Sequence, residues 1–161
     1  EYLDAGASHV IVTSYIFRDG RIDFERLEEM VSAVGSERLV LDLSCRKKDD
    51  GYHIVTDRWQ KITDEIVNIS LLDRLSTKCD EFLIHAADVE GKRGGIEKDL
   101  LNMVSDFDKK TITYAGGVHN FRDIELIGEF GKNRIDFTVG SALDIYGGDM
   151  SFCQIVNMTK I

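Results

Sequence analysis

Five short apolar runs, each followed by an amphipathic stretch, constrain the fold of this chain more than any other feature of its sequence. Each run is nearly continuous rather than alternating, which is typical of strands buried on both faces of a parallel sheet. The runs are HVIVT (9–13), RLVLDL (38–43), FLIHA (82–86), TITYA (111–115) and IDFTVG (135–140). Because strands that alternate with helices favour right-handed crossovers, we expect an α/β fold with a parallel sheet.

The stretches between the runs carry apolar residues at helical spacing. The predicted helices cover 23–35, 70–79, 96–107, 120–130 and 151–158. Three of these stretches open on a residue that is predicted to be an N-cap, namely Ser70, Asn120 and Ser151. Residues 44–69 are too long for one loop, and GYHIV after the turn-like KKDDG predicts a small hairpin there.

Two parallel architectures fit this order, an open doubly wound sheet and a closed (β/α)8 barrel. A barrel of about 250 residues spends about 31 residues on each βα unit, so that five units need about 156 residues. The chain has 161 residues and therefore fits a partial (β/α)8 barrel. No linker or low-complexity segment interrupts it, so we expect residues 1–161 to form a single domain.

The composition excludes several classes of protein. The chain has 29 acidic and 20 basic residues, whereas nucleic-acid binding requires clustered cations, so we expect no nucleic acid as a partner. The cysteines lack CxxC spacing, which indicates neither a disulfide framework nor a metal site. There is no apolar stretch of about 18 residues and no secretory leader, so we expect no membrane partner and a cytoplasmic location.

Glycines follow the last two predicted strands, at the edge where ligands bind in both architectures. Gly116 and Gly117 stand between a strand and a helix, where unshielded backbone N–H groups and the helix dipole favour an anion. Gly140 and Ser141 follow the next strand. The alternative is a pair of tight turns that need glycine for their dihedral angles. Two adjacent glycine turns together predict a phosphate site.

Asp42 ends an otherwise apolar strand, where a carboxylate is costly to bury unless it is solvated, paired or used in chemistry. Burial would raise its pKa and suit it to general acid catalysis. The alternatives are an ion pair with Arg46 or Lys47, or a capping role. Cys45 has no activating histidine beside it in the sequence, so we interpret it as a structural thiol.

The loop DVEGKRGG (88–95) combines acidic, basic and glycine residues. Either it closes over a ligand, with Lys92 or Arg93 reaching an anion, or it is a solvated surface loop. His9 and His85 flank predicted strands, and we interpret both as core or edge residues rather than ligands.

The strings VLDLSCRKK, EFLIHAADVEGKRGG, TYAGGVHNFRD and VGSALDIYGG, in this order and spacing, resemble the eukaryotic type of phosphoribosylformimino-5-aminoimidazole carboxamide ribotide isomerases of histidine biosynthesis. The resemblance implies a (β/α)8 barrel that converts an aminoaldose to an aminoketose by an Amadori rearrangement without a cofactor. It also implies a small-molecule substrate with a phosphate at each end.

The resemblance implies roles for individual residues. Gly116, Gly117, Gly140 and Ser141 would bind one phosphate, and Thr13 and Ser14 would form half of the site for the other. This family uses two aspartates, of which Asp42 matches the general acid that protonates the ribose ring oxygen. Trp59 matches a tryptophan that stacks on the imidazole of the substrate, with ordinary packing under the hairpin as the alternative.

The chain also departs from the family. Bacterial members place a threonine at the end of the sixth strand, where this chain is expected to have Ala86 and Ala87. We therefore expect Asp88 to assist ring opening, with Arg93 as a further substrate contact. The Gly-Thr that follows their fourth strand is replaced by Thr13 and Ser14.

The resemblance begins in the helix before the fourth strand of the barrel. The chain would thus lack strands one to three and the second aspartate, which predicts a truncated barrel that self-associates through open edges and is inactive alone.

Two other functions stay open at this point. One is an inactive fragment that binds phosphate or a complementary half-barrel. The other is the cyclase subunit of imidazole glycerol phosphate synthase, although DLSCRKK and HAADVEGKRGG fit the isomerase better.

Overall fold

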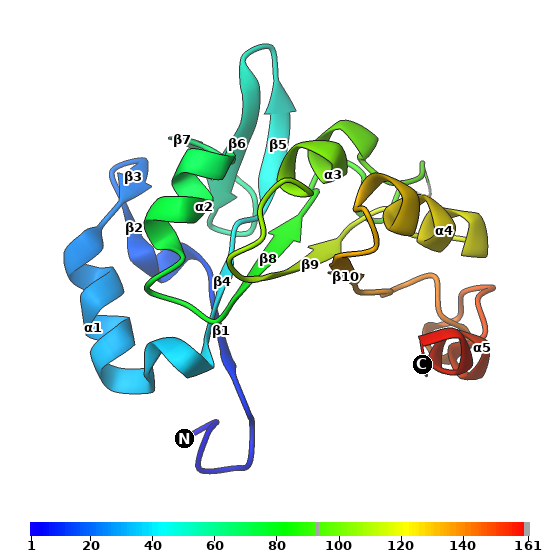
Figure 1. Cartoon of the computed structure of the whole chain (residues 1–161), viewed down its shortest axis with the longest axis horizontal. Coiled ribbons are helices and arrows are strands. Elements are labelled where there is room, and N and C mark those ends of the chain that lie inside the picture. Colours follow the sequence, from blue (N-terminus) through cyan, green and yellow to red (C-terminus); the bar gives the residue numbers. More distant parts are fainter. Residues whose placement is uncertain (93, 160–161) are drawn as a thin grey trace.

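Five parallel strands form the main sheet of the molecule (Figure 1). The computed structural model describes residues 1–92 and 94–159. The strands are β1 (Val10–Val12), β4 (Leu39–Asp42), β8 (Glu81–His85), β9 (Thr111–Ala115) and β10 (Ile135–Phe137). They lie side by side in the order in which they occur in the chain. A doubly wound sheet reverses its strand order at a switch point, whereas a barrel does not, so this order indicates a partial (β/α)8 barrel.

Helices pack on one face of the sheet. They are α1 (Phe24–Val34), α2 (Ile69–Leu75), α3 (Lys98–Val104), α4 (Phe121–Phe130) and α5 (Phe152–Thr159). Leu41, Phe82 and Ile84 are fully buried in one hydrophobic cluster with apolar residues of these helices. Successive residues of a strand point to opposite faces of the sheet. Asp42, which follows Leu41, and Leu83, which lies between Phe82 and Ile84, are only partly buried. The face that carries Asp42 is therefore the one away from the helices.

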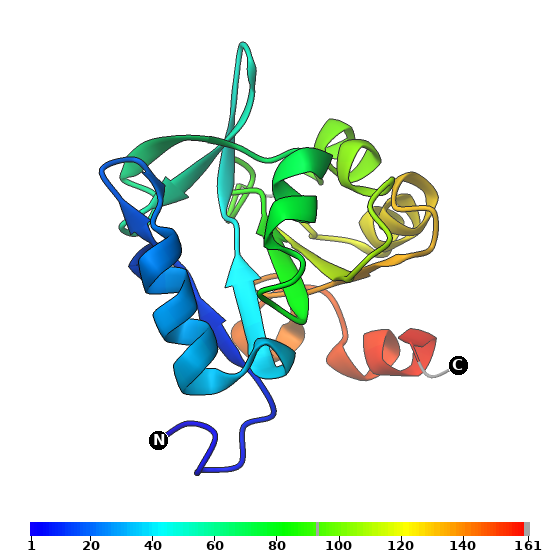
Figure 2. The same ribbon diagram turned by 60° about the vertical axis from the view of Figure 1, so that its left-hand side comes forward.

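Two antiparallel excursions interrupt the alternation of strands and helices. The first is a hairpin of β2 (Phe17–Arg18) and β3 (Arg21–Ile22), which the sequence pattern did not predict. The second follows β4 and consists of β5 (Cys45–Lys48), β6 (Gly51–Thr56) and β7 (Lys61–Ile66). The hairpin predicted within 44–69 is thus confirmed and has a third strand. β5 and β6 extend beyond the end of β4 (Figures 1 and 2).

The five apolar runs are confirmed as strands, but the last one is shorter than predicted and ends at Phe137. Asn120 is confirmed as the cap of α4, where it forms a capping box with Asp123. Ser151 accepts a hydrogen bond from the Gln154 backbone N–H, as expected for the start of α5. The prediction for Ser70 was wrong, because α2 begins two residues earlier and Asn68 caps it through the Leu71 N–H at 2.9 Å.

The outer strands β1 and β10 are the edges of the sheet formed by the described residues. On β1, the side chain of Ile11 is 57% exposed. Self-association through these edges stays a prediction. In the described part of the chain, no helix has the length and apolar character needed to cross a membrane.

The displaced cap of α2 gives a direct test of the local structure. Asn68→Ala removes the oxygen that accepts from Leu71, so we expect it to lower the free energy of unfolding by about 1 kcal/mol. Ser70→Ala, within the helix, should change it by less than about 0.5 kcal/mol. Urea unfolding of both variants measures these differences. A larger loss for Ser70→Ala would contradict the assignment.

Candidate active site

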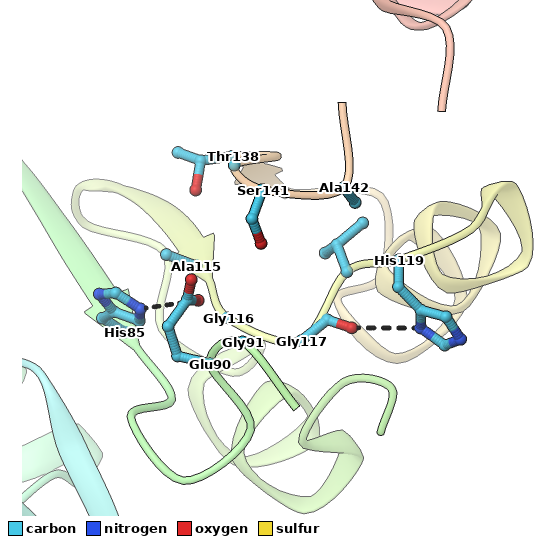
Figure 3. Close-up of a pocket in the computed structure, with 12 residues that line it drawn as sticks. His85, Glu90, Gly91, Ala115, Gly116, Gly117, His119, Thr138, Ser141 and Ala142 are labelled. Carbon is cyan, nitrogen blue, oxygen red and sulfur yellow. Dashed lines mark hydrogen bonds and ion pairs between the residues drawn. The ribbon is translucent and has the colours of Figure 1, made fainter. Parts of the chain in front are cut away.

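Two cavities lie beside the carboxyl ends of the parallel strands. The first, here called the glycine cavity, has a volume of about 190 Å³ and is lined by Gly116, Gly117, Gly140 and Ser141 (Figure 3). The structure thus brings together the four residues that were predicted to bind one of the two phosphates. In Figure 3 the hydroxyl of Ser141 points into the space between the two glycine turns.

The glycines of this cavity are present for different physical reasons. Gly116 has φ +112° and Gly117 has φ +76°, and an added Cβ would lie 2.7 Å from the Ala86 carbonyl oxygen or 2.1 Å from that of Gly95. Backbone conformation and close packing therefore require both of them. At Gly140 an added Cβ would meet nothing within 4 Å. Packing therefore does not demand a glycine at this position, which borders open space in the cavity.

The N-terminus of α4 is already occupied by a carboxylate of the chain itself. Asp123 is buried and accepts hydrogen bonds from the backbone N–H groups of His119 at 3.0 Å and Asn120 at 3.3 Å. The helix dipole therefore stabilises Asp123 first. Any anion in the glycine cavity would depend on the N–H groups of the turns and on the Ser141 hydroxyl, rather than on a free helix end.

The second cavity, here called the Asp42 cavity, has a volume of about 430 Å³. It is lined by Thr13, Ser14, Asp42 and Trp59, together with Ser44 and Arg58. The predicted acid, the predicted contacts of the other phosphate and the predicted stacking residue are thus neighbours. The Ser14 Oγ accepts a hydrogen bond from the Asp57 backbone N–H at 2.9 Å, so its proton is available to a ligand.

Asp42 is the last residue of β4, and its environment favours the neutral acid. Burial raises the pKa of Asp42, while a hydrogen bond donated by the Ser44 hydroxyl at 2.8 Å and the charge of His85 oppose that rise. The alternative of an ion pair with Arg46 or Lys47 is wrong. Arg46 lies 3.6 Å from Asp88 and Lys47 lies 2.7 Å from Asp99.

Trp59 reaches the Asp42 cavity from the loop between β6 and β7. Three consecutive residues there, Asp57, Arg58 and Trp59, have φ values of +53°, +56° and +65°. This left-handed conformation costs of order 1 kcal/mol or more at each non-glycine residue. It places the indole edge-on against the His85 ring, with centroids 4.9 Å apart. Trp59 therefore packs at the cavity rather than under the hairpin, and its stacking on a substrate stays a prediction.

Asp88 and Arg93 are the two other residues that were predicted to contact the substrate. Asp88 accepts a hydrogen bond from the Lys47 backbone N–H at 2.9 Å and pairs with Arg46. It lines neither cavity, so these bonds do not favour the predicted role of Asp88 in ring opening. Arg93 lies outside the described residues.

Sequence reasoning missed His85. β8 ends at His85, and Ala86 follows it directly in a parallel bridge with Cys45, so Ala86 and Ala87 stand at the end of this strand as expected. His85 was interpreted as a core or edge residue, and the structure places its side chain at the lining of the glycine cavity. The alternation of side chains along FLIHA would have placed it on the Asp42 face of the sheet.

From the sequence, Cys45 was interpreted as a structural thiol, and the cysteines indicated no metal site. Burial raises the pKa of Cys45, so the thiolate that a nucleophile needs is strongly disfavoured, and the interpretation as a structural thiol is supported. Within residues 1–92 and 94–159, no group of three or more His, Cys, Asp or Glu side chains is arranged to hold a metal ion.

Comparison with known proteins identifies the family. The family model described as "Histidine biosynthesis protein" matches residues 1–151. The chain belongs to this family. A relative from Medicago truncatula is 50% identical over 155 residues, which cover 96% of this chain and 50% of the relative. Relatives from Yarrowia lipolytica and Saccharomyces cerevisiae are each 43% identical, over 92% and 89% of this chain and 60% and 58% of their own lengths.

These three relatives share one name, 1-(5-phosphoribosyl)-5-((5-phosphoribosylamino)methylideneamino) imidazole-4-carboxamide isomerase. This histidine biosynthesis family member spans about half to three-fifths of their length. The M. truncatula relative is described as chloroplastic, so the cytoplasmic location expected from the sequence stays a prediction.

The two kinds of glycine in this family member can be separated by experiment. Gly117→Ala forces a left-handed alanine against the Gly95 carbonyl, and we expect it to lower the free energy of unfolding by about 1 to 3 kcal/mol. Gly140→Ala should change this free energy by less than about 0.5 kcal/mol but weaken the binding of inorganic phosphate. Urea unfolding and calorimetric titration measure the two effects. Undiminished phosphate binding by Gly140→Ala would contradict a ligand role.

The raised pKa of Asp42 predicts a pH-dependent stability. The folded protein holds the proton of Asp42 more tightly than the unfolded chain does, so this stabilisation is complete below the unfolded pKa of about 4 and is lost as pH rises through the folded pKa. Asp42→Asn stays neutral and can still accept from Ser44. We therefore expect it to raise the free energy of unfolding at pH 7, with a gain that vanishes near pH 3.

Asp99 provides a matched control of opposite sign. Its hydrogen bond to Lys47 lowers the pKa of Asp99, so its contribution is present at pH 7 and is lost as pH falls. Asp99→Asn should lower the free energy of unfolding at pH 7. Denaturation across this pH range measures the free energy of unfolding of both variants. Equal losses of this free energy at pH 7 in both variants would show that the fold stabilises the charged form of Asp42.

Proposed function

We propose that this chain forms the general-acid side of an aldose-ketose isomerase of histidine biosynthesis, acting on a bis-phosphorylated aminoimidazole carboxamide ribotide. The observation that carries the proposal is Asp42, an acid with a raised pKa in a cavity at the carboxyl end of β4. The names of the relatives support the reaction class, and the two phosphoribosyl groups in those names agree with a substrate that has two phosphates.

In this proposal Asp42 starts the reaction by opening the ribose ring of the aminoaldose. Burial raises the pKa of its carboxyl and so favours the protonated form that a general acid requires. The proton goes to the ring oxygen as the bond between C1 and that oxygen breaks, and the lone pair of the attached nitrogen forms a C1=N double bond. Asp42 is left as a carboxylate that accepts from Ser44.

The rearrangement also needs a base that removes the proton from C2. The resemblance to the isomerase family assigns this step to an aspartate at the end of a first barrel strand. The described residues contain strands that would correspond to the fourth to eighth, so the base would come from the part of the relatives that this chain does not span.

The glycine cavity would hold one phosphate through the N–H groups of its turns and the Ser141 hydroxyl. Thr13 and Ser14 would contact the other phosphate from the Asp42 cavity, where Trp59 would stack on the imidazole. Each phosphate would thus fix one end of the substrate, with the ribose that opens beside Asp42.

A second candidate function is phosphate binding without turnover. It is favoured by the length of the chain, which spans 50% of the M. truncatula relative, while both cavities consist of its own residues. In this case the chain alone binds inorganic phosphate and does not convert the aminoaldose.

A chimera tests the catalytic proposal. The chain is joined to the segment of the M. truncatula relative that it does not span, and conversion of the aminoaldose to the aminoketose is followed by chromatography. We expect turnover by the chimera and a fall in kcat of roughly 100- to 10,000-fold in Asp42→Asn, because proton transfer by a positioned acid contributes about that much.

Asp99→Asn is the matched control, since Asp99 lies outside both cavities and pairs with Lys47. Its kcat should stay within about threefold of the unmodified chimera, because nothing is removed from the acid site. Undiminished turnover by Asp42→Asn would overturn the assignment of the acid. Turnover by the isolated chain would overturn the second candidate function.

A further inference from the structure

We propose that His85 is a positioning residue of this reaction, a cation beside Asp42 that stabilises the carboxylate left when Asp42 gives up its proton. The inference rests on the proposed function for its chemistry. It rests on the arrangement of β4, β8 and the two cavities for its geometry.

The pairing of the strands places His85 on the same face of the sheet as Asp42. Asp42 is in register with Leu83 on the neighbouring strand β8, and His85 follows two residues later. Side chains two residues apart on a strand share a face, while Phe82 and Ile84 point to the buried helix side. From the rise along a strand and the spacing between strands, the Cα atoms of Asp42 and His85 are about 8 Å apart. Two inward side chains can meet over this separation.

Contacts place the His85 ring between the two cavities. The ring lines the glycine cavity (Figure 3). It also packs against Trp59, which lines the Asp42 cavity. The Nε2 atom lies 3.2 Å from the Glu90 carboxylate, which lines the glycine cavity as well. The His85 side chain is 19% exposed. The ring is thus held on two sides, by an aromatic edge and by an acid.

Four charged or titratable groups line the two cavities beside the ring. They are Asp42 from β4, Glu90 from the loop after β8, Arg58 from the β6–β7 loop and His119 from the loop after β9. Of these groups, Glu90 is the one in direct contact with the ring, at 3.2 Å from Nε2. A positive charge on this ring would lie at the glycine cavity and on the face of the sheet that carries Asp42.

The chemical role follows from the needs of a buried acid. Burial favours the protonated form of Asp42 and at the same time disfavours release of the proton, because the product carboxylate is poorly solvated. The charge of His85 lowers the pKa of Asp42 and so offsets part of this penalty. His85 forms no bond and transfers no proton in this role; it acts through Asp42.

The test compares three variants in the chimera. His85→Asn removes the cation, and we expect kcat to fall roughly 10- to 100-fold with KM changed less than about threefold, because the transition state loses stabilisation that the bound substrate does not have. The alkaline limb of the kcat profile should move to higher pH, since Asp42 holds its proton longer. His85→Lys, which restores a cation, should move the limb back.

His9→Asn is the matched control, since His9 precedes β1 and pairs with Asp80 before β8, at the opposite end of the sheet. It should leave kcat and the pH profile unchanged. A rise in KM for His85→Asn with an unmoved alkaline limb would overturn the proposal, because a residue that only supports Trp59 would give that result.

A second measurement does not depend on turnover. In the chain itself, carbon NMR of the aspartate carboxyl groups follows the titration of Asp42, and His85→Asn should raise its pKa whereas His85→Lys should not. An unchanged pKa of Asp42 overturns the role of His85 even if the chimera is active. If His85→Asn raises the pKa of Asp42 in the chain but the chimera shows no turnover, the interaction between His85 and Asp42 is supported. That result overturns the proposed function instead.

Discussion

The rest of the structure depends on the parallel pairing of five strands in chain order, with helices packed on one face. Parallel pairing brings the carboxyl ends of all five strands to the same edge, so residues far apart in sequence, such as Ser14, Asp42 and Gly140, line neighbouring cavities. Burial of the helix face fixes the register, because a shift by one residue would turn Leu41 and Phe82 away from the core. The same constraint points Asp42 and His85 away from the core.

Much of this arrangement follows from local sequence pattern. The apolar runs predicted the strands because β-branched residues concentrate in them, and the glycine turns were predicted because Gly116 and Gly117 have dihedral angles that other residues avoid. Asp42 stood out as a carboxylate in an apolar run. In each case the signal comes from one residue and its immediate neighbours.

The features that could not be predicted depend on contacts between distant residues. Asn68 rather than Ser70 caps α2 because the entry of the chain from β7 decides where the helix begins. The ions near Asp42 in sequence are paired elsewhere, Arg46 with Asp88 and Lys47 with Asp99, because β5 carries them past the end of β4. His85 gave a weak signal, since a histidine at a strand end has many uses and its partner Trp59 is 26 positions away in the chain.

Hydrogen bonds and an ion pair connect the antiparallel sheet after β4 to the residues that follow β8. Asp88 accepts from the Lys47 backbone, Lys47 pairs with Asp99, and the Tyr52 hydroxyl donates to Glu97 at 3.0 Å. Because these bonds link the two segments at several points, neither can move far without the other. One segment supplies Trp59 and the other supplies Glu90, and both contact the ring of His85. His85 is therefore the residue of the main sheet that both segments contact, and through it they bear on the face of the sheet that carries Asp42.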